Sequence, residues 1–255
     1  MKNSYRKVHV ARVLQGILIF LMVMAAVDNT AAQVKEWNYV VLGDSQSFGL
    51  FPRYTAILEQ DLGVKINITN RAVGGQHSSS LVRELRENRD LQHALKEAKV
   101  VTLNVPMAVF GNAGFLFNSG NCGGVDNQDC FRDALKVYQE DTAAIFAEIV
   151  SLSNPSKALV RTMDTHQMMV RQRKARGGFE VVKFYWQAAN KCVIEVATKH
   201  RIPMARVYAA FMGPNGDDDP EDKGLVSKDG QHPTAQGNDL IARLFRELGY
   251  QYAPP

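Results

Sequence analysis

Short apolar, β-branched runs recur along the chain, and longer segments with helical periodicity separate them. The runs predict strands at residues 39–42, 64–69, 100–105, 158–163 and 204–208. Helices are expected at 51–62, at 131–152 and after Pro233. The apolar stripes of the last two contain Phe131, Leu135, Tyr138, Ile145, Phe146 and Ile149, and Ile241, Leu244, Phe245 and Leu248. Such alternation predicts an α/β fold, with a parallel sheet covered by helices on both sides.

The amino-terminal segment has a different pattern. Basic residues within 2–12 precede an almost wholly apolar stretch at 13–27, and Thr30-Ala31-Ala32 offers small residues for cleavage before Gln33. This is typical of a secretory signal, and the apolar run is short for a membrane span. We therefore expect a signal peptide at 1–32 and a single secreted domain at 33–255, extracellular or periplasmic, without an integral membrane span. An uncleaved amino-terminal anchor is the alternative.

The formal net charge of the 255 residues is +4. Without residues 1–32 it falls to about +1 by the same count, so the basic balance belongs mostly to the targeting segment. The remaining chain has no sustained basic stripe, and no nucleic acid is expected as a partner.

The apolar run at 39–42 stops abruptly at Gly43-Asp44-Ser45. Functional groups in parallel sheets gather at the carboxyl ends of strands, so Ser45 is well placed as a nucleophile. The structural alternative is that Asp44 and Ser45 only cap the helix that follows.

A second polar stretch, Asp229-Gly230-Gln231-His232-Pro233, lies near the other end of the chain. Pro233 restrains the backbone of His232, and Asp229 is close enough in sequence to orient the imidazole. With Ser45 these residues would form a nucleophile, base and acid. Taken without Ser45, they would be an ordinary turn and a surface histidine.

The stretch 70–78 follows the second predicted strand and should lie beside the Ser45 turn. Its Gly74-Gly75 pair could bring a backbone N–H close to a developing oxyanion. A tight turn that needs the conformational freedom of glycine is the alternative.

Taken together and in this order, the three stretches resemble the SGNH (GDSL) hydrolase family of esterases and lipases over residues 39–250. The resemblance implies a flavodoxin-like three-layer α/β/α sandwich around a sheet of about five strands. It implies Ser45 as nucleophile, His232 as base and Asp229 as orienting acid, with no cofactor. It also implies the N–H groups of Ser45 and Gly75 as oxyanion donors; Gly75 is preferred to Gly74 because a polar residue and a nearby serine follow it. An α/β-hydrolase is disfavoured because the second glycine of its nucleophile elbow is missing.

One family element departs from the pattern. The third strand should end in Gly-x-Asn-Asp, whose asparagine donates to the oxyanion, but residues 102–109 read TLNVPMAV. Matching the apolar run puts Ala108 at the asparagine position, whereas sliding the pattern back puts Asn104 there. Asn112 is a third candidate, and a site without a side-chain donor stays open. We expect Asn104.

Cys122 and Cys130 lie in a loop rich in glycine and asparagine, and in an oxidising compartment we expect them to form a disulfide. Cys192 is expected to be a buried thiol. No metal site is expected, because no histidine or second cysteine pair lies near. The acidic run 217–222 lacks the spaced ligands of a calcium loop and is interpreted as solvated.

Two segments that follow strands could shape substrate choice. Residues 110–117 and 171–176 come after the third and fourth strands, and the second contains Arg171, Arg173, Lys174 and Arg176. These cations could attract an anionic headgroup, although a charge run is usually a solvated face. Asp164 and His166 are a rival acid/base pair, disfavoured by the family order.

The leading hypothesis is a secreted serine esterase that cleaves carboxylic esters through an acyl-enzyme intermediate. Its substrate would be a small-molecule, lipid or carbohydrate ester. The alternative is a non-catalytic or weakly active carbohydrate- or lipid-binding protein of the same fold. The oxyanion asparagine separates the two, since its loss argues for weakened turnover.

Overall fold

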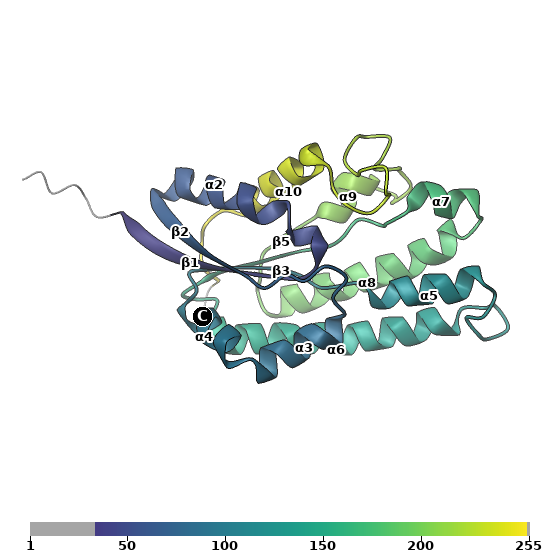
Figure 1. The fold of residues 1–255 in the computed structure, drawn as a ribbon, viewed down its shortest axis with the longest axis horizontal. Helices are drawn as coiled ribbons and strands as arrows, with labels where there is room; N and C mark the ends of the chain where they lie inside the picture. The colour runs from purple at the N-terminus through teal and green to yellow at the C-terminus, as the bar shows by residue number, and fades with distance from the viewer. Residues whose placement is uncertain (1–33, 254–255) are drawn as a thin grey trace, which may run out of the picture. The chain divides into compact units, whose positions relative to one another are not determined.

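The computed structural model describes residues 34–253, and a parallel sheet lies at its centre (Figure 1). The strand order is β2-β1-β3-β4-β5, and all neighbouring strands run parallel. The strands are β1 (Lys35–Leu42), β2 (Val64–Asn70), β3 (Val100–Asn104), β4 (Leu159–Met163) and β5 (Met204–Ala205). The predicted α/β fold with five parallel strands is therefore confirmed.

The apolar runs form strands because their side chains are buried on both faces of the sheet. Residues 39–42 of β1 and all of β3 and β4 are buried. The hydroxyl groups of Tyr39 and Thr102 hydrogen-bond to each other at 2.8 Å, so these two buried polar atoms do not remain unpaired.

The fifth predicted strand is mostly wrong. Only Met204–Ala205 pairs with β4, and the chain then turns into helix α9 (Val207–Met212). The Asp164 carboxylate accepts the Tyr208 N–H at 2.7 Å, within the first turn of α9. A carboxylate at a helix amino terminus accepts from a free amide and interacts favourably with the helix dipole. Asp164, which is distant in sequence, therefore favours the start of α9 where the strand was predicted to continue.

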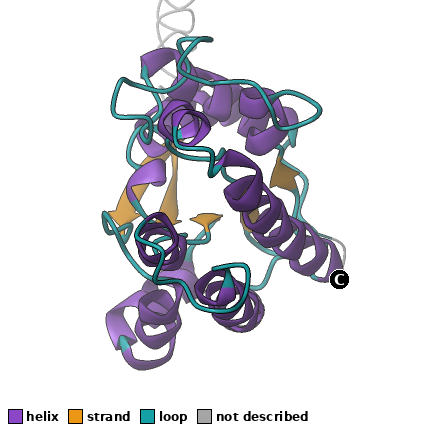
Figure 2. Ribbon diagram, turned by 90° about the vertical axis from the view of Figure 1, so that its right-hand side faces the viewer, coloured by secondary structure: helices purple, strands orange, loops and turns teal. Residues whose placement is uncertain are grey.

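Helices cover both faces of the sheet (Figures 1 and 2). Tyr54, Phe211 and Phe245 belong to the core on one face, and Phe110, Phe131 and Tyr138 to the core on the other. The first face is covered by α2 (Leu50–Leu62), α9 and α10 (Ala235–Glu247). The second is covered by α3 (Ser78–Glu87), α4 (Arg89–Glu97), α5 (Val109–Asn118), α6 (Asp129–Ser153) and α8 (Phe179–Lys199).

Helices α2 and α10 approach each other closely near their amino-terminal ends. A Cβ atom at Gly49 would lie 2.2 Å from the amide of Asn238, so a larger residue there would displace that amide. Asn238 Nδ2 in turn donates to the carbonyls of Pro233 (3.1 Å) and Thr234 (2.9 Å), which ties the start of α10 together.

Two further expectations concern the cysteines and the acidic run. The Cys122–Cys130 disulfide is confirmed, and Cys192 is a buried free thiol. The acidic run is not simply solvated: Asp219, Glu221 and Asp222 all contact Arg171 of the short helix α7 (Val170–Ala175). Opposite charges thereby hold α7 against the loop before α10.

No helix within residues 34–253 is long and apolar enough to cross a membrane. The same residues contain no cluster of histidine, cysteine or carboxylate side chains suited to a metal ion. The predicted signal at 1–32 lies outside the described residues.

Candidate active site

The Gly43-Asp44-Ser45 turn follows β1 and begins a short 3-10 helix, η1 (Ser45–Ser47). Gly43 has φ +130°, and a Cβ atom there would lie 1.9 Å from Asn104 Oδ1, so the turn needs glycine for both conformation and space. The Asp44 carboxylate accepts the Gln46 N–H at 3.0 Å and caps η1. Ser45 is thereby held at the carboxyl end of β1.

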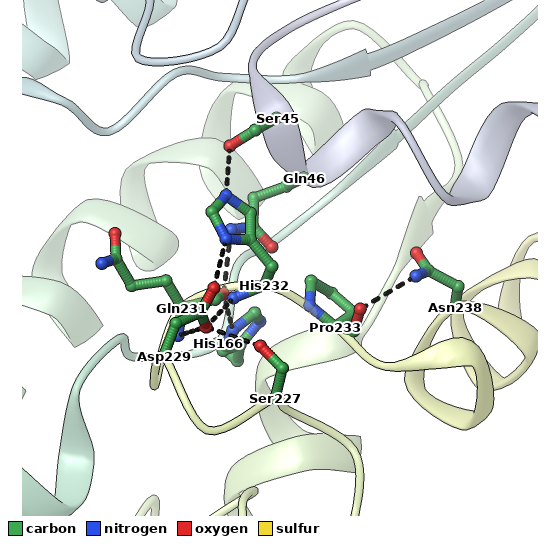
Figure 3. A network of polar contacts seen from close by, with 9 residues as sticks. All are labelled: Ser45, Gln46, His166, Ser227, Asp229, Gln231, His232, Pro233 and Asn238. Carbon is green, nitrogen blue, oxygen red and sulfur yellow. Dashed lines mark hydrogen bonds and ion pairs between the residues drawn. The ribbon is translucent and has the colours of Figure 1, made fainter.

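A chain of hydrogen bonds joins Ser45, His232 and Asp229 (Figure 3). Ser45 Oγ lies 3.0 Å from His232 Nε2, and His232 Nδ1 lies 2.7 Å from Asp229 Oδ2. Because a carboxylate accepts, Nδ1 of a neutral imidazole carries the proton, and Nε2 is free to accept from the serine hydroxyl. This arrangement suits transfer of the Ser45 proton to His232.

Asp229 is held ionised by its own loop. Its Oδ1 atom accepts from Ser227 Oγ at 2.7 Å and from the N–H groups of Gln231 (2.8 Å) and His232 (3.0 Å). Burial opposes ionisation, but the hydrogen bonds from Ser227 and His232 outweigh it and lower the pKa of Asp229 below its ordinary value. The site therefore has a charged acid to stabilise an imidazolium.

Two side chains hold the carbonyl of Gln231, the residue before His232, in place. It accepts from Gln46 Nε2 at 3.1 Å and lies 3.0 Å from His166 Nε2 (Figure 3). His166 is buried and stacks on Phe211 at 4.9 Å between ring centroids. Burial lowers the pKa of His166 to about 4, so the ring is neutral near pH 7 and its Nε2 donates the hydrogen bond.

The rival pair Asp164 and His166 does not assemble. The Asp164 carboxylate contacts Arg206 and the Tyr208 N–H, whereas His166 contacts Gln231. The sequence interpretation missed the bracing contact of His166. No local pattern reveals it, because Gln231 is far away in the sequence.

The loop that contains Gly74 and Gly75 (the glycine loop) lies beside the Gly43-Asp44-Ser45 turn. The N–H of Val73 donates to the Gly43 carbonyl at 3.0 Å, which continues the pairing of β2 with β1. Gln76 N–H donates to the Val73 carbonyl at 3.1 Å and closes a β-turn, with Gly75 at φ +69°. Neither Gly74 nor Gly75 uses its N–H within this turn, and both line the pocket at Ser45.

Asn104, the predicted oxyanion donor, lies beneath the turn. It is 1% exposed; its Nδ2 donates to Asp44 Oδ1 at 2.9 Å, and its Oδ1 accepts from Ser47 Oγ (2.6 Å) and Asp44 N–H (3.1 Å). Its side chain therefore braces the turn and does not line the pocket, which argues against the oxyanion role. Asn112 is exposed and also outside the pocket lining, whereas Ala108 lies in the wall and has no side-chain donor.

A pocket of about 480 Å³ opens at Ser45 and His232. Its wall is mainly apolar, formed by Met107, Ala108, Met168, Met169 and Trp186, and it contains one cation, Arg173. A separate hollow of about 520 Å³ lies on the α3 side of the glycine loop and does not include Ser45. The pocket can therefore accommodate an apolar group next to the serine hydroxyl.

Neither protein-family models nor curated protein sequences match the chain. Solved structures do match it. A lipase from a goat rumen metagenome superposes with a TM-score of 0.67 and 19% identity, covering 86% of this chain and 100% of the lipase. A GDSL-like lipase from Parabacteroides merdae gives 0.61 and 13%, covering 86% and 98%. An acetylxylan esterase from Geobacillus stearothermophilus gives 0.60 and 15%, covering 87% and 99%.

These identities are low, so the likeness concerns the arrangement of the backbone. It spans most of this chain and nearly all of each matched protein. The resemblance read from the three sequence stretches is confirmed at that level: the chain has the three-layer α/β/α fold found in GDSL-like lipases and an acetylxylan esterase.

Proposed function

We propose that the protein is a serine ester hydrolase of the SGNH type. The observation that carries the proposal is the continuous hydrogen-bonded chain from Ser45 through His232 to Asp229 at the mouth of an apolar pocket. The lipase and esterase names of proteins with the same fold support it.

In the proposed reaction, His232 takes the Ser45 proton as Oγ attacks the ester carbonyl. The oxyanion accepts from the N–H groups of Ser45 and Gly75, with Gly74 as the neighbouring alternative. As the tetrahedral intermediate collapses, the alcohol leaves with the proton from His232. Water then attacks the acyl-enzyme with His232 as base, which releases the acid and restores Ser45.

We further propose that residues 1–32 direct export and that 33–255 form the single hydrolase domain. The basic, apolar and small-residue order of the first segment supports this. The Cys122–Cys130 disulfide supports it too, because such bonds persist in oxidising compartments.

A weakly active or purely binding protein is the second candidate. It is favoured by one observation, that neither Asn104 nor Asn112 lines the pocket and Ala108 offers no donor. Loss of one oxyanion donor typically costs about 3 kcal/mol of transition-state stabilisation. Catalysis would then rest on backbone donors.

The decisive experiment compares wild type with Ser45→Ala on 4-nitrophenyl esters of increasing chain length. We expect kcat to fall by about 10⁴-fold or more while the melting temperature stays the same, because the hydroxyl carries chemistry and no packing. Ser151→Ala, on an exposed position of α6, is the matched control and should leave both values unchanged.

Retained hydrolysis in folded Ser45→Ala would refute the proposed nucleophile. A wild type that cleaves no ester of the panel, and whose Ser45 is not labelled by a fluorophosphonate, would favour the binding protein.

A further inference from the structure

Arg173 is a cation in the apolar wall of the candidate active site. It lies on α7 and lines the pocket together with Ser45 and His232. Its guanidinium carbon lies 5.5 Å from the centre of the Trp186 ring. Its Nη1 atom is inaccessible to solvent and has no hydrogen-bond partner among residues 34–253.

Among the described residues, three nearby cations form ion pairs with carboxylates, and Arg173 does not. Arg171, on the same helix, contacts three carboxylates. Lys183 contacts Asp217, and Arg206 contacts Asp164. In the described part of the chain, no carboxylate forms an ion pair with Arg173.

Arg173 remains charged despite this environment. Burial lowers the pKa of Arg173 to about 10, so the guanidinium is still a cation at neutral pH. A buried charge without a partner is costly, and the ring of Trp186 offsets only part of that cost. An anion entering the pocket would compensate the charge of the guanidinium.

We propose that Arg173 binds a carboxylate of the substrate, so that the preferred esters carry an anionic group in addition to the scissile bond. This inference rests on the proposed function, which it narrows. A guanidinium matches a carboxylate in geometry and charge. The thioethers of Met107, Met168 and Met169 suit a hydrocarbon stem between the two groups.

The shape of the wall beyond Arg173 is consistent with an extended substrate. A hollow of about 220 Å³ adjoins the pocket and shares Gly111, Met169 and Arg173 with it. Arg173 therefore stands between two cavities, where an anionic group could reach it from the side of Ser45.

The test compares anionic esters with neutral esters of similar size. In one pair the charge is on the acyl side, mono(4-nitrophenyl) adipate against 4-nitrophenyl hexanoate. In the other it is on the alcohol side, 4-acetoxybenzoate against 4-acetoxybenzamide. We expect wild type to prefer the anionic member of one pair, and that pair identifies the side bearing the carboxylate.

Arg173→Met removes the charge and keeps an apolar side chain on Trp186. For the preferred anionic ester we expect kcat/KM to fall by about 10- to 100-fold, with less than about a threefold change for its neutral partner. Arg83→Met makes the same change in net charge at an exposed position of α3, outside the pocket, and should preserve the preference. Arg173→Lys should keep part of it.

An equilibrium measurement separates this inference from the proposed function. Calorimetric titration of Ser45→Ala with the intact anionic ester should show binding about 10-fold tighter than with the neutral ester, and Ser45→Ala/Arg173→Met should lose the difference. Arg173-dependent binding without any hydrolysis would overturn the hydrolase and keep the anion site. Hydrolysis of neutral esters, with no Arg173-dependent preference in rate or binding, would overturn the anion site alone. If Arg173→Met is unfolded by circular dichroism, Arg173→Gln replaces it in both measurements.

Discussion

Replacing His166 by glutamine should reduce the loss of unfolding free energy as the pH falls. His166 is buried between Phe211 and the Gln231 carbonyl, and its pKa lies at about 4 in the folded protein. In the unfolded chain an ordinary histidine titrates near pH 6.5. Glutamine can still offer an Nε2 donor, but it does not titrate.

The sign and size of the effect follow from these two values. Between about pH 6.5 and 4 the unfolded chain binds a proton at His166 that the folded protein does not, so falling pH favours unfolding. Above that range both states are neutral, and below it both are protonated. A lowering of this size corresponds to about 3 kcal/mol of unfolding free energy, lost across the window.

The assay is urea unfolding of wild type and His166→Gln at several pH values from 8 to 4. The variant should be less stable at pH 8 by about 1 kcal/mol, because it loses the ring contact with Phe211. Wild type should then lose about 3 kcal/mol more than the variant as the pH falls to 4. His232 and Asp229 also act on His166 electrostatically, and both are present in the two proteins, so the difference isolates His166.

Parallel stability curves for the two proteins would contradict this prediction, since His166 would then titrate alike in the folded and unfolded states. A second check is the imidazole resonance of His166 in the folded protein. Its titration near pH 6.5 would show that burial does not suppress the charge.

Asn104→Ala leaves the buried Asp44 carboxylate without one hydrogen-bond donor. We therefore expect both the unfolding free energy, by about 3 kcal/mol, and kcat to fall. A 100-fold lower kcat with an unchanged melting temperature would instead support Asn104 as an oxyanion donor. Gly43→Ala places a methyl group 1.9 Å from Asn104 Oδ1 at a positive φ and should cost more than about 3 kcal/mol, and a normal melting temperature would contradict this. The double change Cys122→Ser and Cys130→Ser opens a short loop that lies outside the pocket. In urea unfolding the free energy of unfolding should fall by about 2 kcal/mol, while kcat should stay the same. Stability equal to that of the oxidised protein would contradict the prediction.

The fold was predictable because its strands are short apolar runs that end at turn residues, as β1 does at Gly43. The fifth strand was not, because α9 begins where the distant Asp164 carboxylate meets the Tyr208 N–H. The β-propensity of residues 204–208 gives no information about that contact.

The arrangement of the candidate site was predictable where its residues are close in sequence. Asp229 and His232 share one loop, and their hydrogen bond follows from that spacing. His166 was considered only in a rival acid/base pair and Arg173 only in a basic run. Their contacts with Gln231 and Trp186 could not be predicted, since these contacts join separate elements. For Asn104 the residue was noticed, but the direction of its amide depends on Asp44 beneath the turn.

The close approach of Gly49 to Asn238 couples the proposed ester hydrolysis to the packing of α2 against α10. Ser45 lies just before α2 and His232 just before α10, so each partner of the proposed catalytic hydrogen bond moves with its helix. A shift of α10 along α2 would change the distance from Ser45 to His232 before it opened the core. A misplacement of reacting groups by about 1 Å can lower a rate about 100-fold. A loss of activity would therefore reveal a small shift of α10 that leaves the melting temperature unchanged.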